Sequence, residues 1–379
     1  MNIGIITQPL AQNYGGILQN FALQKVLKSL GHNVYTVNKR NIFLPYNYLS
    51  FKDKIIWRIK QFIKKYIGRE YYASLGEFQV INQHFTEFVQ KNIITTERYA
   101  SQEQLQKIVS NYNFEAYVVG SDQVWRPIYT DNIYNDFLGF CEKLSCVKRI
   151  AYAASFGVDS WEFSNEQTNE CSRLARMFDA ISVREDSGIA LCKAYLGVEA
   201  IQVLDPTMLL EKEEYIKLIN TSPRENFVGD MFCYILDYSS EIETAIKHIE
   251  DKCSLTSFQV KEKKHFSSIK IGDDLKDYII PSPAKWLQAF MDAKLIFTDS
   301  FHGCVFSIIF NKPFWVIGNK WRGNARFDSL LKTFNLENRR IQLNEIENIN
   351  LALSIDWENV NLIKKELQAT SLDFLKRYF

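Results

Sequence analysis

The stretch Asp299-Ser300-Phe301-His302-Gly303 lies in the most regular part of the chain, residues 284–327. Apolar spacing around it predicts a helix over 284–293 and a buried strand over 295–298, then a polar turn that holds His302. A helix over 304–310 and a strand over 313–317 are predicted to follow. This alternation of helices and short apolar strands predicts an α/β fold with a parallel sheet.

His302 is the candidate functional residue of this stretch. In an open α/β sheet, ligands collect where strands end and helices begin, because backbone N–H groups and the helix dipole favour an anion there. An imidazole titrates near neutral pH, and a cationic loop follows the second strand, with Lys320, Trp321, Arg322 and Arg326. The pattern indicates a site for a small acidic ligand. The alternative is that His302 only caps or packs a helix.

A second strand–helix–strand pattern opens the chain. An apolar strand over 3–7 precedes Asn13-Tyr14-Gly15-Gly16, an apolar helix that Gly31 ends, and a strand over 33–37. Paired glycines at a helix N-terminus let a ligand approach the backbone closely, although neither the dinucleotide spacing nor a Walker lysine is present. We interpret the segment as an acceptor or phosphate loop, and a plain tight turn explains the glycines equally well.

The predicted buried strand over 116–120 also ends in polar residues, Ser121, Asp122 and Gln123, with Trp125 close behind. Small polar groups after such a strand point to the ligand crevice, and an indole ring can stack on a sugar. Asp122 is a candidate base for a sugar hydroxyl, with a helix N-cap as its alternative role.

The predicted strand over 180–183 delivers Arg184 at its carboxyl end. This arginine either pairs with Glu185 or Asp186, or binds an anion, since a guanidinium group suits planar carboxylates and phosphates. Geometry alone does not choose between the two roles.

The length of 379 residues favours two domains, because one core rarely serves so long a chain. Pro206, directly after a predicted strand over 201–204, marks the junction. We therefore expect a first domain over 1–205, a second over 206–355, and a C-terminal helix over 356–379 that packs back toward the first domain.

Composition excludes several classes of protein. With 45 basic and 44 acidic residues the net charge is +1, which does not indicate a nucleic-acid partner. Seven cysteines occur without a CxxC pair or a Cys/His cluster, so we expect reduced thiols and no metal site. Cys304 is interpreted as a buried thiol rather than a nucleophile. The chain starts without a signal-peptide pattern, and we expect a cytoplasmic protein.

Residues 50–92 form a basic insertion that differs from the rest of the first domain. Its cationic residues are Lys52, Lys54, Arg58, Lys60, Lys64, Lys65 and Arg69. A basic amphipathic helix can lie on an anionic membrane, which would place the protein at the inner membrane face beside a lipid-linked substrate. The alternative is a helix whose charged face is simply solvated.

Six short segments in this order resemble the polysaccharide pyruvyl transferase family, over nearly the whole chain. They are Asn13–Gly16 with Leu18-Gln19 and Ala22–Gln24, Gly120–Trp125, Ala151–Gly157, Ser182–Glu185 with Ser187, Asp205–Thr207, and Thr298–Gly303. The resemblance implies two Rossmann-like domains that face each other across a cleft, similar to the glycosyltransferase-B architecture. It also implies transfer of pyruvate from phosphoenolpyruvate to two hydroxyls of one sugar as a ketal, without a cofactor or metal.

The resemblance also assigns residues. The family's donor histidine falls on His302 and its arginine on Arg184, which we expect to be catalytic. Family members carry Arg-Leu-His where this chain has Ser300-Phe301-His302, so one cation is missing, and Arg322 or Arg326 is expected to replace it. The expected donor site is Arg184, Ser300, Phe301, His302, Gly303, Arg322 and Arg326. The expected acceptor site is Asn13, Tyr14, Gly15, Ser121, Asp122, Gln123 and Trp125.

The acceptor implied by the resemblance is a sugar of a bacterial-type surface polysaccharide or its lipid-linked precursor. Two other functions were considered. A nucleotide-sugar glycosyltransferase of the same architecture usually has a carboxylate after the donor histidine, yet between Gly303 and Leu336 there is no glutamate and only one aspartate, Asp328. A non-catalytic sugar-binding protein of a polysaccharide assembly complex is the other alternative.

Overall fold

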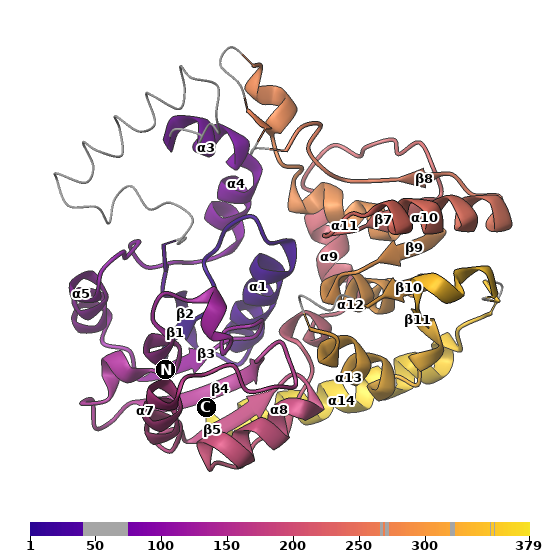
Figure 1. Ribbon diagram of the computed structural model, residues 1–379. Coiled ribbons are helices and arrows are strands. Elements are labelled where there is room, and N and C mark those ends of the chain that lie inside the picture. Colours follow the sequence, from indigo (N-terminus) through magenta and orange to yellow (C-terminus); the bar gives the residue numbers. More distant parts are fainter. Residues whose placement is uncertain (41–74, 266–267, 270–272, 319–322, 349, 352) are drawn as a thin grey trace.

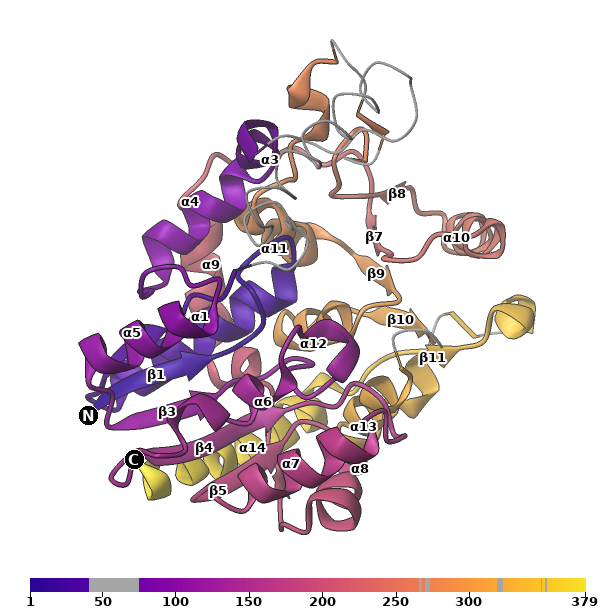
Figure 2. The same ribbon diagram turned by 60° about the vertical axis from the view of Figure 1, so that its left-hand side comes forward.

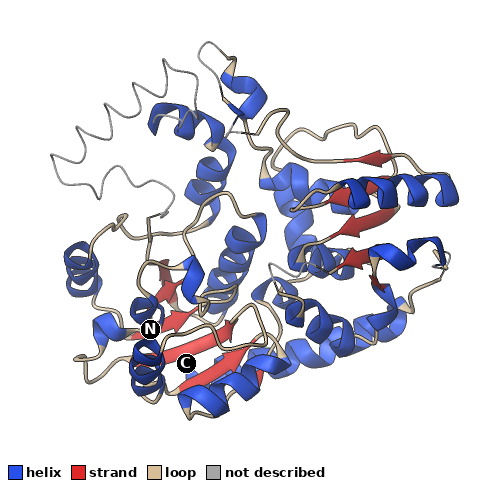
Figure 3. Cartoon of the chain, viewed as in Figure 1, coloured by secondary structure: helices blue, strands red, loops and turns tan. Residues whose placement is uncertain are grey.

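The computed structural model describes residues 1–40, 75–265, 268–269, 273–318, 323–348, 350–351 and 353–379. These residues form two α/β domains, each built on a parallel sheet with helices around it (Figure 1, Figure 3). The predicted α/β fold with two Rossmann-like domains is therefore confirmed.

The first domain has a six-stranded sheet in the order β2-β1-β3-β4-β5-β6, in which all neighbouring strands run parallel. Its strands are β1 (Asn2–Ile6), β2 (Asn33–Thr36), β3 (Ala116–Val119), β4 (Lys148–Ala154), β5 (Ala180–Val183) and β6 (Ile201–Gln202). Its helices are α1 (Tyr14–Ser29), α3 (Leu75–Ile81), α4 (Gln83–Asn92), α5 (Gln102–Tyr112), α6 (Ile133–Asp136), α7 (Asn165–Ala175) and α8 (Asp186–Leu191). Shorter turns are η2 (Pro127–Tyr129), η3 (Gly139–Cys141) and η4 (Cys192–Leu196).

Helices lie on both faces of this sheet (Figure 2), which explains why most side chains of its strands are buried. Val118 packs in one core with Leu18 of α1, whereas its neighbour Val119 packs in another with Leu105 of α5 and Leu174 of α7. Successive side chains of a strand point to opposite faces, so each strand serves two helical layers.

The second domain has a five-stranded parallel sheet in the order β11-β10-β9-β7-β8. Its strands are β7 (Met231–Tyr234), β8 (Ser257–Phe258), β9 (Leu295–Thr298), β10 (Phe314–Ile317) and β11 (Arg340–Ile341). Its helices are α9 (Lys212–Ile219), α10 (Ser240–Cys253), α11 (Pro283–Asp292), α12 (Phe301–Ile309) and α13 (Ala325–Thr333). Shorter turns are η5 (Pro206–Leu209), η7 (Leu275–Tyr278), η8 (Glu337–Arg339) and η9 (Leu343–Asn348).

The last helix, α14 (Trp357–Tyr378), returns to the first domain (Figure 1). Ser371 Oγ accepts a hydrogen bond from the backbone N–H of Leu204 (3.0 Å), and Lys148 Nζ donates to the carbonyl of Tyr378 (2.8 Å). The chain thus passes between the domains twice, once near η5 and once at α14.

Several predicted elements differ from the observed ones. The helix that was predicted to start at residue 304 starts at Phe301, so His302 lies in its first turn and not in a loop. The cause is Ser300, which caps the helix through its side-chain oxygen. Ahead of the last helix, Leu343–Asn348 form the 3-10 turn η9. The basic residues from Lys52 to Arg69 lie outside the described residues.

Candidate active site

His302 reaches from the second domain to the first. Ser300 Oγ accepts a hydrogen bond from the N–H of Gly303 (3.4 Å), which fixes the start of α12. The imidazole is buried, and its Nε2 atom lies 3.6 Å from Oδ2 of Asp205 in the first domain. The other side of the ring lies against Gly15, where an added Cβ atom would overlap Nδ1. The ring is therefore held between α1 and the junction of the domains.

Asp205 is the carboxylate that lies next to both Arg184 and His302. Its Oδ1 accepts hydrogen bonds from the N–H (3.0 Å) and the hydroxyl (2.7 Å) of Thr207. Its Oδ2 accepts from Ser121 Oγ (3.0 Å) and Arg184 Nη1 (3.0 Å) and faces His302. Burial alone would raise the pKa of Asp205, but its interactions with His302, Arg184 and Thr207 outweigh burial and hold that pKa far below its usual range. Asp205 is therefore ionised at neutral pH.

Arg184 is buried at the end of β5 and is surrounded by carboxylates. Besides Asp205, its Nη2 lies 3.7 Å from Asp122 Oδ1 and its Nε lies 3.7 Å from Glu185 Oε2. Burial alone would lower the pKa of Arg184, but these three carboxylates raise it above its ordinary value. Of the two carboxylates weighed as partners of Arg184, Glu185 lies beside it, whereas Asp186 lies against Lys332 (3.5 Å).

Phe301 and Arg326 complete the second-domain side of the site. The Arg184 guanidinium carbon lies 4.1 Å from the centre of the Phe301 ring, and that of Arg326 lies 6.0 Å from it. Arg326 is buried, and burial together with the charge of Arg184 lowers its pKa to about 10. Two guanidinium groups thus contact one aromatic ring. Arg322, the other candidate for the missing cation, lies outside the described residues.

The candidate acceptor residues Asn13, Ser121 and Asp122 lie around the same centre. Asn13 Nδ2 donates to Asp122 Oδ2 (3.0 Å), while Asn13 Oδ1 accepts from the N–H of Gly16 and caps α1. Asp122 itself adopts the left-handed backbone conformation (φ 69°) and does not cap a helix, so the capping role proposed for it is wrong. Its carboxylate faces Asn13 and Arg184.

Two other candidate acceptor residues, Trp125 and Gln123, lie in packed surroundings. Trp125 is fully buried, stacks on Phe137 (4.7 Å between ring centres) and donates its Nε1–H to the carbonyl of Asp136 (3.0 Å). It belongs to the core, so the idea that it stacks on a sugar is wrong. Gln123 Oε1 accepts from Arg126 Nη1 (3.2 Å), away from His302 and Asp205.

Tyr14 lies at the contact between the domains. Its ring stacks on Trp286 of the second domain (5.1 Å between ring centres), and its hydroxyl donates to the carbonyl of Pro281 (2.8 Å). In this structure Tyr14 holds the domains together instead of offering an open surface.

The cavity between the domains is small. It has a volume of about 70 Å³ and is lined by Arg184, Asp205 and Phe301 together with apolar residues such as Leu204 and Leu330. This volume corresponds to about two water molecules. A ligand much larger than two water molecules does not fit in this cavity in the observed arrangement of the domains.

Sequence reasoning missed the role of Asp205 within the site. It attributed this residue to the domain junction, because Pro206 follows it. The available signal was its position at the carboxyl end of a strand, the same signal that identified Ser121 and Arg184.

Within the described part of the chain, no group of three or more His, Cys, Asp or Glu side chains is arranged to hold a metal ion. No helix among the described residues is sufficiently long and apolar to cross a lipid bilayer.

Comparison with solved structures identifies the architecture. A glycosyltransferase from Rickettsia africae superposes with a TM-score of 0.51 and 10% identity, covering 98% of this chain and 93% of its own. The UDP-GlcNAc 2-epimerase of Methanocaldococcus jannaschii superposes with a TM-score of 0.50 and 14% identity, and 95% of each chain is covered. The UDP-GlcNAc 2-epimerase of Neisseria meningitidis superposes with a TM-score of 0.50 and 9% identity, covering 100% of this chain and 99% of its own. Such low identities show the glycosyltransferase-B-like fold and nothing about activity.

Comparison by sequence identifies the family. No curated protein matches the chain. The family model described as polysaccharide pyruvyl transferase matches residues 13–320, which is most of the chain. The matched span begins at Asn13 and contains Asp122, Arg184, Asp205 and His302, the residues that meet between the two domains. The chain therefore belongs to the polysaccharide pyruvyl transferase family.

Proposed function

We propose that this protein transfers pyruvate from phosphoenolpyruvate to two hydroxyls of one sugar, forming a ketal and releasing phosphate. The observation that carries the proposal is the meeting of His302 from one domain with Arg184 from the other, at the carboxylate of Asp205. This arrangement lies inside the span that matches the family.

The charges at the site support an acidic donor. Phosphoenolpyruvate carries a carboxylate and a phosphate, and each needs a cationic partner. Arg184 and Arg326 both contact Phe301, so two guanidinium groups are close together at the start of α12. The N–H groups of the first turn of that helix add a further preference for anions. We assign Arg326 to the charge that is missing at Ser300.

The reaction needs a proton donor and a base. In our proposal His302 gives a proton to the methylene carbon of phosphoenolpyruvate, which leaves an oxocarbenium-like carbon at C2. One sugar hydroxyl attacks C2, and the second then displaces phosphate, so C2 ends with two sugar oxygens, a methyl and a carboxylate. Of the two hydroxyl protons, one restores His302 and the other leaves with phosphate or solvent.

Asp205 and Asp122 have different roles in this scheme. The carboxylate of Asp205 lies 3.6 Å from Nε2 and faces the imidazole, which in this scheme carries the proton that it gives to phosphoenolpyruvate. Asp205 is thus a positioning residue for His302 and Arg184. Asp122, which Asn13 orients, is our candidate base for the sugar hydroxyl.

The acceptor in this proposal is a sugar of a surface polysaccharide or of its lipid-linked precursor. The reaction would take place in the cytoplasm or at the inner membrane face. The basic residues of the insertion over 50–92 support the contact with an anionic membrane. No cofactor is needed, because both substrates carry the groups that react.

Thermal shift measurements with the full chain distinguish this function from its alternatives. A ligand at 100 times its Kd stabilises the folded protein by about 2.7 kcal/mol. We expect phosphoenolpyruvate to raise the Tm and uridine diphosphate sugars to leave it unchanged. The opposite result would identify a nucleotide-sugar transferase. No shift with either donor, together with binding of sugars, would identify a non-catalytic sugar-binding protein.

A further inference from the structure

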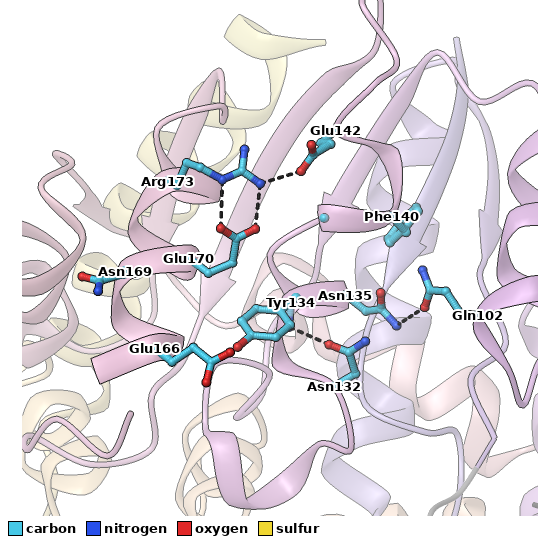
Figure 4. A pocket seen from close by; sticks show the side chains of 11 residues that line it. Gln102, Asn132, Tyr134, Asn135, Phe140, Glu142, Glu166, Asn169, Glu170 and Arg173 are labelled. Atoms are coloured by element: carbon cyan, nitrogen blue, oxygen red, sulfur yellow. Dashed lines mark hydrogen bonds and ion pairs between the residues drawn. The ribbon is translucent and has the colours of Figure 1, made fainter. Parts of the chain in front are cut away.

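A second hollow lies in the first domain and shares no residue with the candidate active site. Its volume is about 680 Å³, within the range of about 300–1,000 Å³ that is typical of small-molecule sites. The start of α5, helix α6, the turn η3 and one face of α7 form its walls (Figure 4). It is the larger of the two hollows described for this structure, and its size admits one or two sugar rings.

Amide and aromatic groups form the floor of the hollow. Asn132 Oδ1 accepts from the N–H of Tyr134 (3.1 Å) and caps α6, and Asn135 Nδ2 donates to Gln102 Oε1 (3.1 Å). Figure 4 shows the ring of Tyr134 between these amides and the side chains of α7. Sugars bind to such surfaces because amides hydrogen-bond hydroxyls and aromatic rings pack against the C–H faces of the sugar.

The charge of the hollow disfavours anionic ligands. Glu142, Glu166 and Glu170 line it together with one cation, Arg173. That cation is already paired, since Nη2 lies 2.6 Å from Glu142 and 2.7 Å from Glu170, and Nε donates to Glu170 (2.9 Å). Two negative charges remain in excess, so a phosphate, a nucleotide or phosphoenolpyruvate would be repelled.

Several polar groups of the hollow are available to a ligand. The hydroxyl of Tyr134, the carboxylate of Glu166 and the amide of Asn169 make no hydrogen bond to any other residue that the structure describes. They offer donors and acceptors on the α7 side of the aromatic ring.

We propose that this hollow binds a neutral or amino-bearing sugar unit of the acceptor saccharide, outside the catalytic site. The ligand class follows from the lining and charge, whereas its identification with the acceptor rests on the proposed function. Residues 121–136 connect the two places along the chain, with Ser121 and Asp122 at one end and Tyr134 at the other. In this proposal a polymeric acceptor contacts both places.

Binding to the full chain tests the proposal, with three probes followed by saturation-transfer NMR and titration. The probes are cellobiose (neutral), glucosamine (amino) and glucuronic acid (acidic). We expect the first two to bind and the third to bind at least tenfold more weakly. Asn169→Ala and Glu166→Gln should each weaken binding about fivefold, the effect of one hydrogen bond. Asn165→Ala, an exposed change on the same helix outside the hollow, is the matched control and should have no effect.

The proposal is overturned if both hollow variants bind the sugars as the wild type does, or if none of the probes binds. An assay of phosphate release from phosphoenolpyruvate distinguishes failure of this proposal from failure of the proposed function. Hollow variants should raise the KM for an oligosaccharide acceptor and leave kcat unchanged. Absence of turnover with intact probe binding contradicts only the proposed function. Turnover with unaltered KM in the variants contradicts only the role of the hollow.

Discussion

The imidazole of His302 and the α-carbon of Gly15 are in direct contact across the domain interface, so that any side chain at Gly15 would overlap the ring. The glycine lies in the first turn of α1, where its backbone does not need an unusual conformation. We infer that this position holds glycine because His302 occupies the space of a side chain.

Gly15→Ala tests this contact. We expect at least a hundredfold loss of transfer, because the added methyl group displaces the imidazole or prevents domain closure. The helix itself should stay folded, since alanine favours a helix by about 1 kcal/mol over glycine. Activity and far-UV circular dichroism are the measurements. Gly76→Ala, in a helix with open space around the α-carbon, is the control and should retain activity.

His302→Gln removes the proposed proton donor and keeps most of the side-chain volume. Transfer should fall below detection in a phosphate-release assay, whereas the Tm should change by only a few degrees. His248→Gln, on α10 of the same domain, should behave like the wild type. Substantial activity in the His302 variant would contradict the role of the imidazole as acid.

Asp205→Asn should lower the free energy of unfolding at neutral pH by about 3–5 kcal/mol, because it removes the charged partner from the buried ion pair of Arg184 Nη1 and Asp205 Oδ2. The pKa of Asp205 is lower in the folded than in the unfolded protein, where it is about 3.9. Its contribution is therefore complete above that value and is lost as the pH falls toward the folded pKa. The stability difference between wild type and variant should shrink below about pH 4. A difference that does not depend on pH would contradict this assignment.

Arg326→Met should raise the KM for phosphoenolpyruvate by about 10–100-fold, since hydrogen bonds to charged groups contribute about 1.5–3 kcal/mol. The stability of the ligand-free protein should not fall by a similar amount, because burial and Arg184 already disfavour the charge of Arg326. Steady-state kinetics and thermal unfolding give the two values. Lys247→Met on α10 is the control, and an unchanged KM in the Arg326 variant would reject the assignment.

The cysteines provide a test of the core. Burial raises the pKa of Cys141 to about 11 and that of Cys171, Cys192 and Cys233 to about 12, and it raises the pKa of Cys304 further. At pH 8 a thiol reagent should react fast with the exposed Cys146 and more slowly with Cys253. Cys146→Ser should remove the fast phase. Rapid reaction of Cys304 would reopen its role as a nucleophile.

The raised thiol pKa values also determine how the stability of the folded protein changes at alkaline pH. The buried thiols are neutral in the folded protein, so their contribution to stability is complete below the unfolded pKa of about 8.5. It is lost as the pH rises above that value. Stability should therefore decline from about pH 8.5 upward, as measured by urea unfolding.

Much of the fold was predictable from local sequence. The strands over 180–183 and 295–298 were predicted with their observed limits, because four consecutive buried residues are bounded by polar ones. The start of α12 was not predicted correctly, because serine favours turns and helix caps alike. Only the structure shows that Ser300 caps this helix.

The site was predicted in part. His302 and Arg184 were assigned to one site, and the structure brings them together at Asp205, which was predicted to lie at the domain junction and was given no role in the site. The error at Trp125 has a different origin. Its ring is enclosed by aromatic residues from separate segments, among them Phe137 and Phe156, and no local pattern reveals that enclosure.

The two passages of the chain between the domains lie side by side, since Gln368 of α14 donates its amide N–H to the carbonyl of Met208 in η5 (2.7 Å). A pair of adjacent covalent connections permits one domain to rotate about the line through them and resists twisting or sliding. Any opening of the domains would thereby be restricted to nearly one axis of rotation. Closing about that axis should return the imidazole and the guanidinium groups to the same relative positions each time.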